Sequence, residues 1–147
     1  MIRKVSGLMA LSLAMFAAGF ALGTAREHGS VVRAEARNRV FEIRTYTANE
    51  GKLADMHARF RNHTLRLFEK HGMTNVGYWS PQDEPLSSNT LIYILAHESR
   101  DAAKKSWDGF RQDPEWQKVQ KESEAHGKLV AKADVVFMDA TDYSPMK

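Results

Sequence analysis

The most constraining feature of the sequence is the alternation of four short strands with two amphipathic helices between Val40 and Met138. The predicted order is strand, helix, strand, strand, helix, strand, and the strands are apolar on both faces. Two helices can cover only one face of a four-stranded sheet, so apolar side chains on the other face require a second chain or a buried ligand. The pattern therefore predicts an α+β domain with an antiparallel four-stranded sheet, and it favours a homodimer.

The predicted strands span residues 40–47, 74–80, 90–97 and 131–138. Alternation in the first strand predicts two sets of side chains, with Phe41, Ile43 and Thr45 on one face and Glu42, Arg44 and Tyr46 on the other. Glu42 and Arg44 can then form an ion pair on one face. Gly77 in the second strand predicts either a bulge or a close approach to the backbone, with Tyr78 and Trp79 on opposite faces.

The first helix is predicted over residues 52–70 and ends before Gly72. A rotation of 100° per residue gathers an apolar stripe, with polar residues opposite, among them Arg59. The stripe contains Leu53, Met56, Phe60, Leu67 and Phe68 together with His57, His63 and Thr64. His57 and His63 are six residues apart and no i, i+4 histidine pair exists, so no metal site is predicted. His63 is the best catalytic candidate of the stripe, because it lies where a pocket between helix and sheet can open.

The second helix is predicted to begin after Ser99, a good N-cap, and to restart at Asp113-Pro114, where Asp113 is the cap. Trp107 and Trp116 lie on its inward stripe. The simplest interpretation makes both of them core residues. A kinked helix that carries large aromatic side chains can also line a ligand pocket.

Composition excludes several classes of function. The sequence has 147 residues and no cysteine, so disulfides, thiolate metal sites and cysteine nucleophiles are all excluded. The formal net charge is +3, and subtraction of Arg3 and Lys4 in a removable leader leaves +1. A charge this small does not indicate binding to nucleic acid.

The N-terminal residues 1–25 have the layout of an export signal. Arg3 and Lys4 precede an apolar run over residues 5–22, and small residues follow, ending at Ala25. We expect a signal peptide cleaved after Ala25 and a periplasmic or cell-envelope protein, with an uncleaved membrane anchor or an organelle-targeting segment as alternatives. Residues 26–39 are then a polar linker, residues 40–139 the domain, and residues 140–147 a C-terminal tail.

Four short motifs resemble one known family. They are Glu42-Ile-Arg-Thr-Tyr46, Gly51-Lys52, Gly77-Tyr-Trp79 and Asp113-Pro-Glu-Trp116. Their order and spacing are similar to the NIPSNAP domain of the dimeric α/β-barrel superfamily, over about Val40 to Asp139. The resemblance implies a ferredoxin-like β-α-β-β-α-β subunit whose sheet packs face to face with that of a second copy. Relatives in the wider superfamily include cofactor-free monooxygenases and haem enzymes, which is an analogy of fold.

We expect a homodimer that binds a small apolar or aromatic molecule between the sheet and the helices. The residues expected to line this pocket are Tyr46, His63, Tyr78, His97, Trp107 and Trp116. Alternate strand faces cannot all reach one cavity, so this set is larger than the true lining. No metal and no cofactor are predicted.

Two alternatives belong to other classes. The first is a monooxygenase-like enzyme, either cofactor-free or haem-dependent, with His63 as base or axial ligand and Tyr78 or Tyr46 as proton donor. The second is an interaction or scaffold protein with an empty, well-packed interior. No acidic pair, nucleophilic triad or phosphate loop in the sequence supports another chemistry.

Overall fold

The structure is a computed structural model that describes residues 39–147. The expected signal peptide or anchor over residues 1–25, and residues 26–38 of the expected linker, lie outside the described residues. No helix within residues 39–147 has the length and the apolar character needed to cross a membrane.

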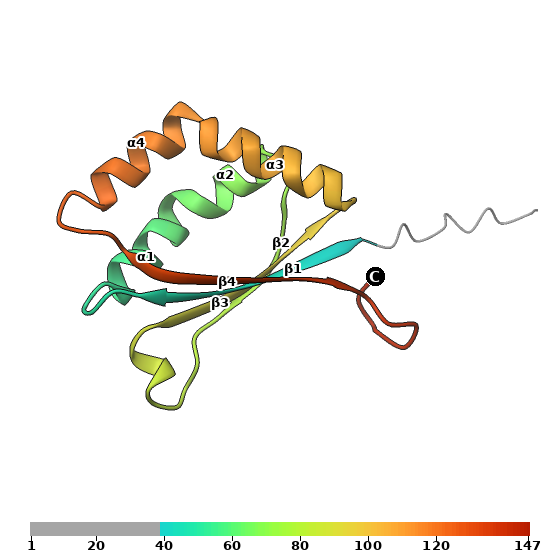
Figure 1. The fold of residues 1–147 in the computed structure, drawn as a ribbon, viewed down its shortest axis with the longest axis horizontal. Helices are drawn as coiled ribbons and strands as arrows, with labels where there is room; N and C mark the ends of the chain where they lie inside the picture. The colour runs from blue at the N-terminus through green and yellow to red at the C-terminus, as the bar shows by residue number, and fades with distance from the viewer. Residues whose placement is uncertain (1–38) are drawn as a thin grey trace, which may run out of the picture. The chain divides into compact units, whose positions relative to one another are not determined.

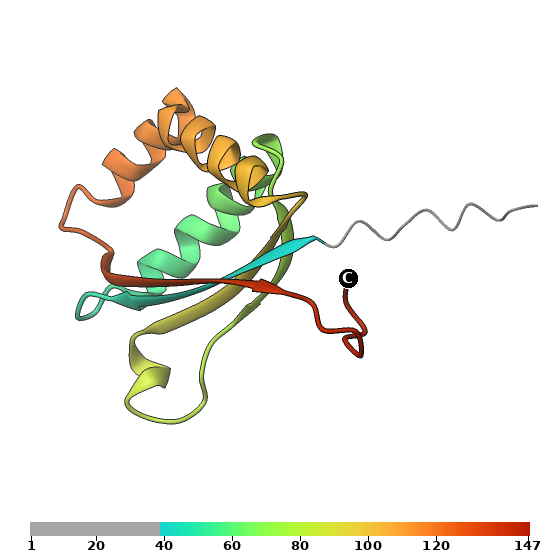
Figure 2. The same ribbon diagram turned by 45° about the vertical axis from the view of Figure 1, so that its right-hand side comes forward.

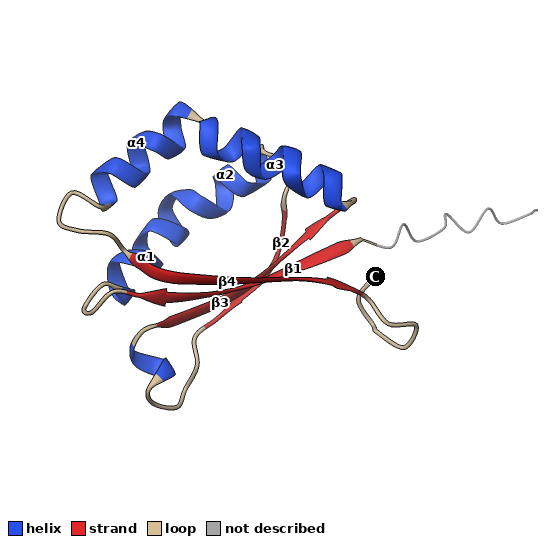
Figure 3. Ribbon diagram, in the orientation of Figure 1, coloured by secondary structure: helices blue, strands red, loops and turns tan. Residues whose placement is uncertain are grey.

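Four antiparallel strands form one sheet in the order β2-β3-β1-β4 (Figures 1 and 3). The strands are β1 (Val40–Ala48), β2 (Thr74–Trp79), β3 (Thr90–His97) and β4 (Val130–Asp139). Each agrees with its predicted range to within one residue at either end. The predicted antiparallel ferredoxin-like sheet is therefore confirmed.

The α-helices lie together on one side of the sheet (Figures 1 and 2). The first helical segment consists of α1 (Leu53–Arg59), the π-helical turn η1 (Phe60–Thr64) and α2 (Leu65–Lys70). The second consists of α3 (Arg100–Gln112) and α4 (Pro114–Ser123), and a short 3₁₀ turn, η2 (Leu86–Ser88), lies between β2 and β3.

The predicted caps of the second helical segment are present. The Ser99 hydroxyl accepts a hydrogen bond from the Ala102 amide at 3.0 Å, and the Asp113 carboxylate accepts one from the Glu115 amide at 2.8 Å. Asp113 also contacts Lys70 and His71 at the end of α2, each at 2.7 Å. Asp113 therefore fixes the junction of α3 and α4 against the first helical segment.

The helices pack on one face of the sheet, and the other face is partly exposed to solvent. Tyr46 and Tyr93 point toward the helices, where their rings pack edge to face at 5.2 Å in the aromatic core. On the opposite face Val136 is 55% exposed and Trp79 is 50% exposed. The alternation predicted for β1 is confirmed, because Glu42 and Arg44 lie on the helix-covered face and pair there at 2.7 Å.

Gly77 shows both of the features that were predicted as alternatives. The register between β2 and β3 shifts between Asn75 and Gly77, which is a β-bulge. The Trp79 ring also lies over Gly77, so closely that a Cβ atom there would be 2.6 Å from the ring. A side chain at position 77 would therefore displace the indole, and glycine lets the ring lie against the backbone.

The π-helical turn corrects the predicted faces of the first helix. A π turn holds more residues than an α turn, so it rotates everything after it relative to a uniform 100° projection. Thr64 takes the buried position and its hydroxyl donates to the Arg59 carbonyl at 3.3 Å. His63, predicted to face inward, is therefore exposed. Arg59, predicted to face outward, precedes the turn and is only 5% exposed because Glu124 and Trp116 pack on it.

Residues 140–147 form a tail that lies beside the open face of the sheet. The Arg39 guanidinium donates to the Lys147 carbonyl at 3.0 Å. Met146 and Phe41 share the lining of a shallow hollow of about 260 Å³ at this end. The tail thus covers one corner of the open face and leaves Val136 exposed.

Candidate ligand-binding site

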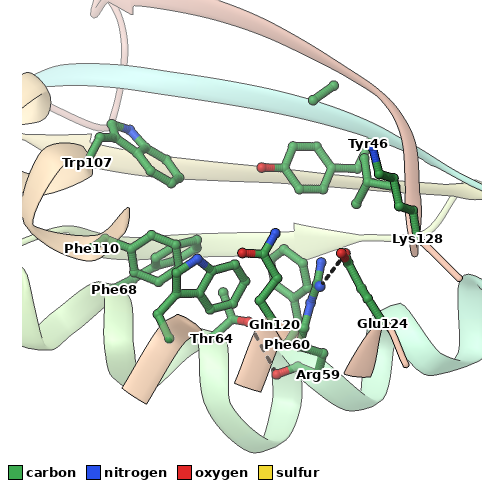
Figure 4. A pocket seen from close by; sticks show the side chains of 13 residues that line it. Tyr46, Arg59, Phe60, Thr64, Phe68, Trp107, Phe110, Gln120, Glu124 and Lys128 are labelled. Carbon is green, nitrogen blue, oxygen red and sulfur yellow. Dashed lines mark hydrogen bonds and ion pairs between the residues drawn. The ribbon is translucent and has the colours of Figure 1, made fainter. Parts of the chain in front are cut away.

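A cavity of about 290 Å³ lies between the sheet and both helical segments (Figure 4). Its volume is near the lower end of the range found for small-molecule pockets. Its lining comes from β1, the first helical segment, α3, α4, the loop after α4, and β4. The lining residues are Tyr46, Arg59, Phe60, Thr64, Phe68, Trp107, Phe110, Trp116, Gln120, Glu124, Lys128, Val130 and Ala133.

Six of the thirteen lining residues are aromatic, and their rings pack on one another. Phe110 packs against Trp116 with ring centroids 4.4 Å apart and against Phe68 at 4.9 Å. Phe68 in turn meets Trp107 edge to face at 5.3 Å. Tilted and edge-to-face pairs of this kind are stabilising and hold each ring in place. The apolar wall is therefore rigid rather than adaptable.

The remaining wall carries charge. The Arg59 side chain is 4% exposed and its Nη1 lies 3.0 Å from a carboxylate oxygen of Glu124. Arg59 also lies beside Trp116, with 5.2 Å between its guanidinium carbon and the ring centroid. Gln120 and Lys128 complete this polar end, which Figure 4 shows on the side away from Trp107.

A buried carboxylate fixes the opposite end of the cavity. Glu42 is fully buried and accepts from Arg44 Nε at 2.7 Å, from His97 Nε2 at 2.8 Å and from Trp107 Nε1 at 2.7 Å. The Arg44 guanidinium also stacks over the Trp107 ring at 3.7 Å, and its Nη1 donates to the Tyr46 hydroxyl at 3.0 Å. Two lining residues, Tyr46 and Trp107, are therefore held by one polar network.

This network lowers the pKa of Glu42. Burial by itself would raise the pKa of Glu42, but hydrogen bonds from His97, Trp107 and Arg44 outweigh it and hold the pKa below its ordinary value of 4.5. His97 Nε2 serves as the donor to this carboxylate, while its buried Nδ1 has no hydrogen-bond partner within residues 39–147.

Three of the six expected pocket residues, Tyr46, Trp107 and Trp116, line the cavity. The other three do not. His97 points to Glu42, and Tyr78 stacks on Tyr93 and donates to Asn75 at 2.5 Å, because the core around these strands is filled. Burial raises the pKa of Tyr78 well above its ordinary value, with a further contribution from Glu69, which disfavours a role in proton transfer.

His63 lies in a separate, open hollow between the first helical segment and α4. The π turn rotates it away from the sheet. No histidine lines the cavity between sheet and helices in the described part of the chain. The residues present therefore do not fit a haem that would be held in this cavity by His63. Within the same residues no cluster of three metal-ligating side chains is found.

Sequence reasoning missed the charged and amide residues of the cavity, namely Arg59, Gln120, Glu124 and Lys128. The 100° projection places Arg59 on the outer face of a regular helix, and its burial comes from Glu124 and Trp116, which are distant in the sequence. Glu124 and Lys128 follow the end of α4, and nothing in the local sequence indicates that this loop returns to the sheet.

The fold and the cavity define a ferredoxin-like α+β protein with a pocket between its sheet and its helices. The sequence profile of the NIPSNAP family matches residues 41–145. The chain therefore belongs to the NIPSNAP family. Comparison with curated protein sequences gives no match.

Crystal structures of similar fold come from several bacteria. A NIPSNAP family protein of unknown function from Agrobacterium tumefaciens is 21% identical, with a TM-score of 0.66 over 76% of this chain and 96% of that one. An uncharacterised NIPSNAP-like domain protein from Burkholderia xenovorans is 16% identical, with a TM-score of 0.64 over 74% and 90%. SnoaB, a cofactor-independent oxygenase from Streptomyces nogalater, is 15% identical, with a TM-score of 0.51 over 74% and 98%. At these identities the likeness shows the fold alone.

The Glu42 network predicts a pH-dependent stability. The pKa of Glu42 is lower in the folded than in the unfolded chain, so its contribution is complete above the unfolded value and is lost as the pH falls below about 4.5. We expect Glu42→Gln to lower the free energy of unfolding by about 2–3 kcal/mol at pH 7, because the amide cannot accept from all three donors. The difference in the free energy of unfolding between the variant and the native protein should be smaller at pH 3.5. Urea titrations at both pH values measure it, and an unchanged difference would contradict the assignment.

Proposed function

We propose that the protein binds a compact, largely flat apolar molecule in the cavity between the sheet and the helices. The observation that carries this proposal is the aromatic lining, which surrounds open space where a packed core would otherwise lie. Six aromatic side chains contribute to it: Tyr46, Phe60, Phe68, Trp107, Phe110 and Trp116. Rigid aromatic walls with a few polar groups at one end are typical of pockets that select a ligand by shape.

The two alternatives have less support. The monooxygenase-like alternative needs a base beside the substrate, and His63, its assigned base, lies in the separate open hollow. Of the residues assigned to that chemistry only Tyr46 lines the cavity. The scaffold alternative expects an empty and well-packed interior, which a cavity of about 290 Å³ does not favour.

Filling the cavity should weaken ligand binding. Ala133 lines the cavity on β4 and pairs with Tyr46 across the sheet, so Ala133→Phe places a ring inside the space. We expect the affinity to fall about tenfold or more. Native mass spectrometry of protein purified from its own host, followed by denaturation, detects any retained small molecule.

Ala131→Phe is the matched control, since Ala131 lies on the same strand, is exposed and does not line the cavity. It should retain the ligand as the native protein does. Equal retention by Ala133→Phe, or a native protein that carries no small molecule, would count against the proposal.

We further propose that the protein is a homodimer formed through the uncovered face of the sheet. Ile92 and Ile94 of β3 lie on this face and are only partly buried, and Val136 of β4 is 55% exposed there. An apolar surface of this kind on a sheet is stable when a second sheet packs on it. Because the partner would be a second copy, the contact would be symmetric.

One strand offers a matched pair of variants for the dimer. Val136 lies on the open face, whereas Val135, its neighbour on β4, lies on the helix side and is 40% exposed. Val136→Asp should raise the dimer dissociation constant about a hundredfold, because a carboxylate would be buried without a partner. Val135→Asp should leave the mass in solution unchanged. Light scattering coupled to size exclusion measures both, and equal behaviour of the two variants would argue against this interface.

A further inference from the structure

The polar end of the cavity contains a donor that the described chain leaves without an acceptor. Arg59 uses Nη1 for its contacts with Glu124 at 3.0 Å and with Ser123 Oγ at 3.4 Å. Its Nε is buried and has no hydrogen-bond partner among residues 39–147. A buried N–H that forms no hydrogen bond is costly, and such groups are rare in folded proteins. Arg59 lines the cavity, and Nη1 is the only guanidinium atom that forms a hydrogen bond to a described residue, so the guanidinium keeps donor capacity for a ligand.

The charge at this end is positive. Arg59, Glu124 and Lys128 are the charged lining residues, and together they sum to +1. Lys128 contacts no carboxylate in the part of the chain that the structure describes. The ion pair with Glu124 therefore leaves one positive charge at the rim without a counter-charge among these residues. An anionic group in the cavity would supply it.

The aromatic wall continues to this charged end. The Trp116 ring lies beside the Arg59 guanidinium and packs on the Phe110 ring. Phe110 in turn packs on Trp107, with ring centroids 5.6 Å apart. A flat molecule along this wall would therefore carry its polar group toward Arg59. The aromatic wall of the cavity therefore lies next to the Arg59 guanidinium and the Lys128 ammonium group.

We propose that the ligand of this cavity is a planar aromatic carboxylate, whose ring lies along the Trp107–Trp116 wall and whose carboxylate accepts from the Arg59 guanidinium near Lys128. This inference rests on the proposed binding function and narrows it to an anionic class. An arginine N–H to a carboxylate is a charge-assisted hydrogen bond, which is stronger than one to a neutral acceptor. Glu124 competes for the same guanidinium and limits the affinity.

Two probes of the same shape separate the inference from the proposed function. They are 2-naphthoate, which is anionic, and 2-naphthamide, which is neutral. Binding to the full chain is followed by quenching of tryptophan fluorescence, since Trp107 and Trp116 line the cavity and Trp79 does not. We expect 2-naphthoate to bind about tenfold more tightly than 2-naphthamide at pH 7.

Variants then assign the preference to Arg59. In Arg59→Gln the affinity for 2-naphthoate should exceed that for 2-naphthamide by less than about twofold. Arg66→Gln is the control of equal charge change, because Arg66 is exposed, pairs with Glu115 on the surface and does not line the cavity. It should keep the full preference. Glu124→Gln removes the competing carboxylate and should tighten 2-naphthoate binding about threefold or more, which tests the inference even where Arg59→Gln does not fold.

The outcomes are distinct. Equal affinity of the native protein for both probes overturns the carboxylate inference and leaves the binding function standing. A preference that survives Arg59→Gln, or weaker 2-naphthoate binding in Glu124→Gln, also overturns it. Quenching by neither probe overturns the inference together with the proposed pocket.

Discussion

The buried carboxylate of Glu42 is the contact on which the rest of the structure depends. It takes hydrogen bonds from Arg44 on the same strand, from His97 on β3 and from Trp107 on α3. A carboxylate without exposure to water is tolerated only when such donors replace its hydration. The same bonds hold α3 to the sheet and set the position of the Trp107 ring. Fold and cavity therefore share one polar anchor, and the loss of one donor would disturb both.

The fold could be predicted closely because local rules determine it. Side chains alternate along a strand, so β1 had to place Glu42 and Phe41 on opposite faces. Ser99 and Asp113 cap helices because their side-chain oxygens accept hydrogen bonds from backbone amides two or three residues later. Gly77 was identified because a glycine inside a strand usually marks a bulge or a close approach to the backbone. Each of these inferences requires only neighbours in the sequence.

The site was only partly predictable because it depends on departures from regular geometry and on distant contacts. The π turn moves His63 off the inner face, and no hydrophobic period reveals a turn with an extra residue. Arg59, which precedes this turn, is buried by Trp116 and Glu124, which are distant in the sequence. His97 was predicted to line the pocket. The register of β1 and β3 instead places its Nε2 2.8 Å from the Glu42 carboxylate, a contact between residues far apart in the sequence. Trp107 and Trp116 were found because large aromatic side chains at helical spacing face the core whether or not a cavity lies there.

The Arg59–Glu124 pair is informative because stability alone does not explain it. Removal of two charges from water costs about as much as their attraction returns, so a buried ion pair is usually no more stable than well-packed apolar side chains. Arg59 is nevertheless 4% exposed beside Trp116, in a lining that includes six aromatic side chains. It ends α1, and Trp116 of α4 and Glu124, which follows α4, bury it. A cation that is held at the wall of an aromatic cavity by contacts outside the regular helix pattern is the pattern expected of a binding site and not of a core.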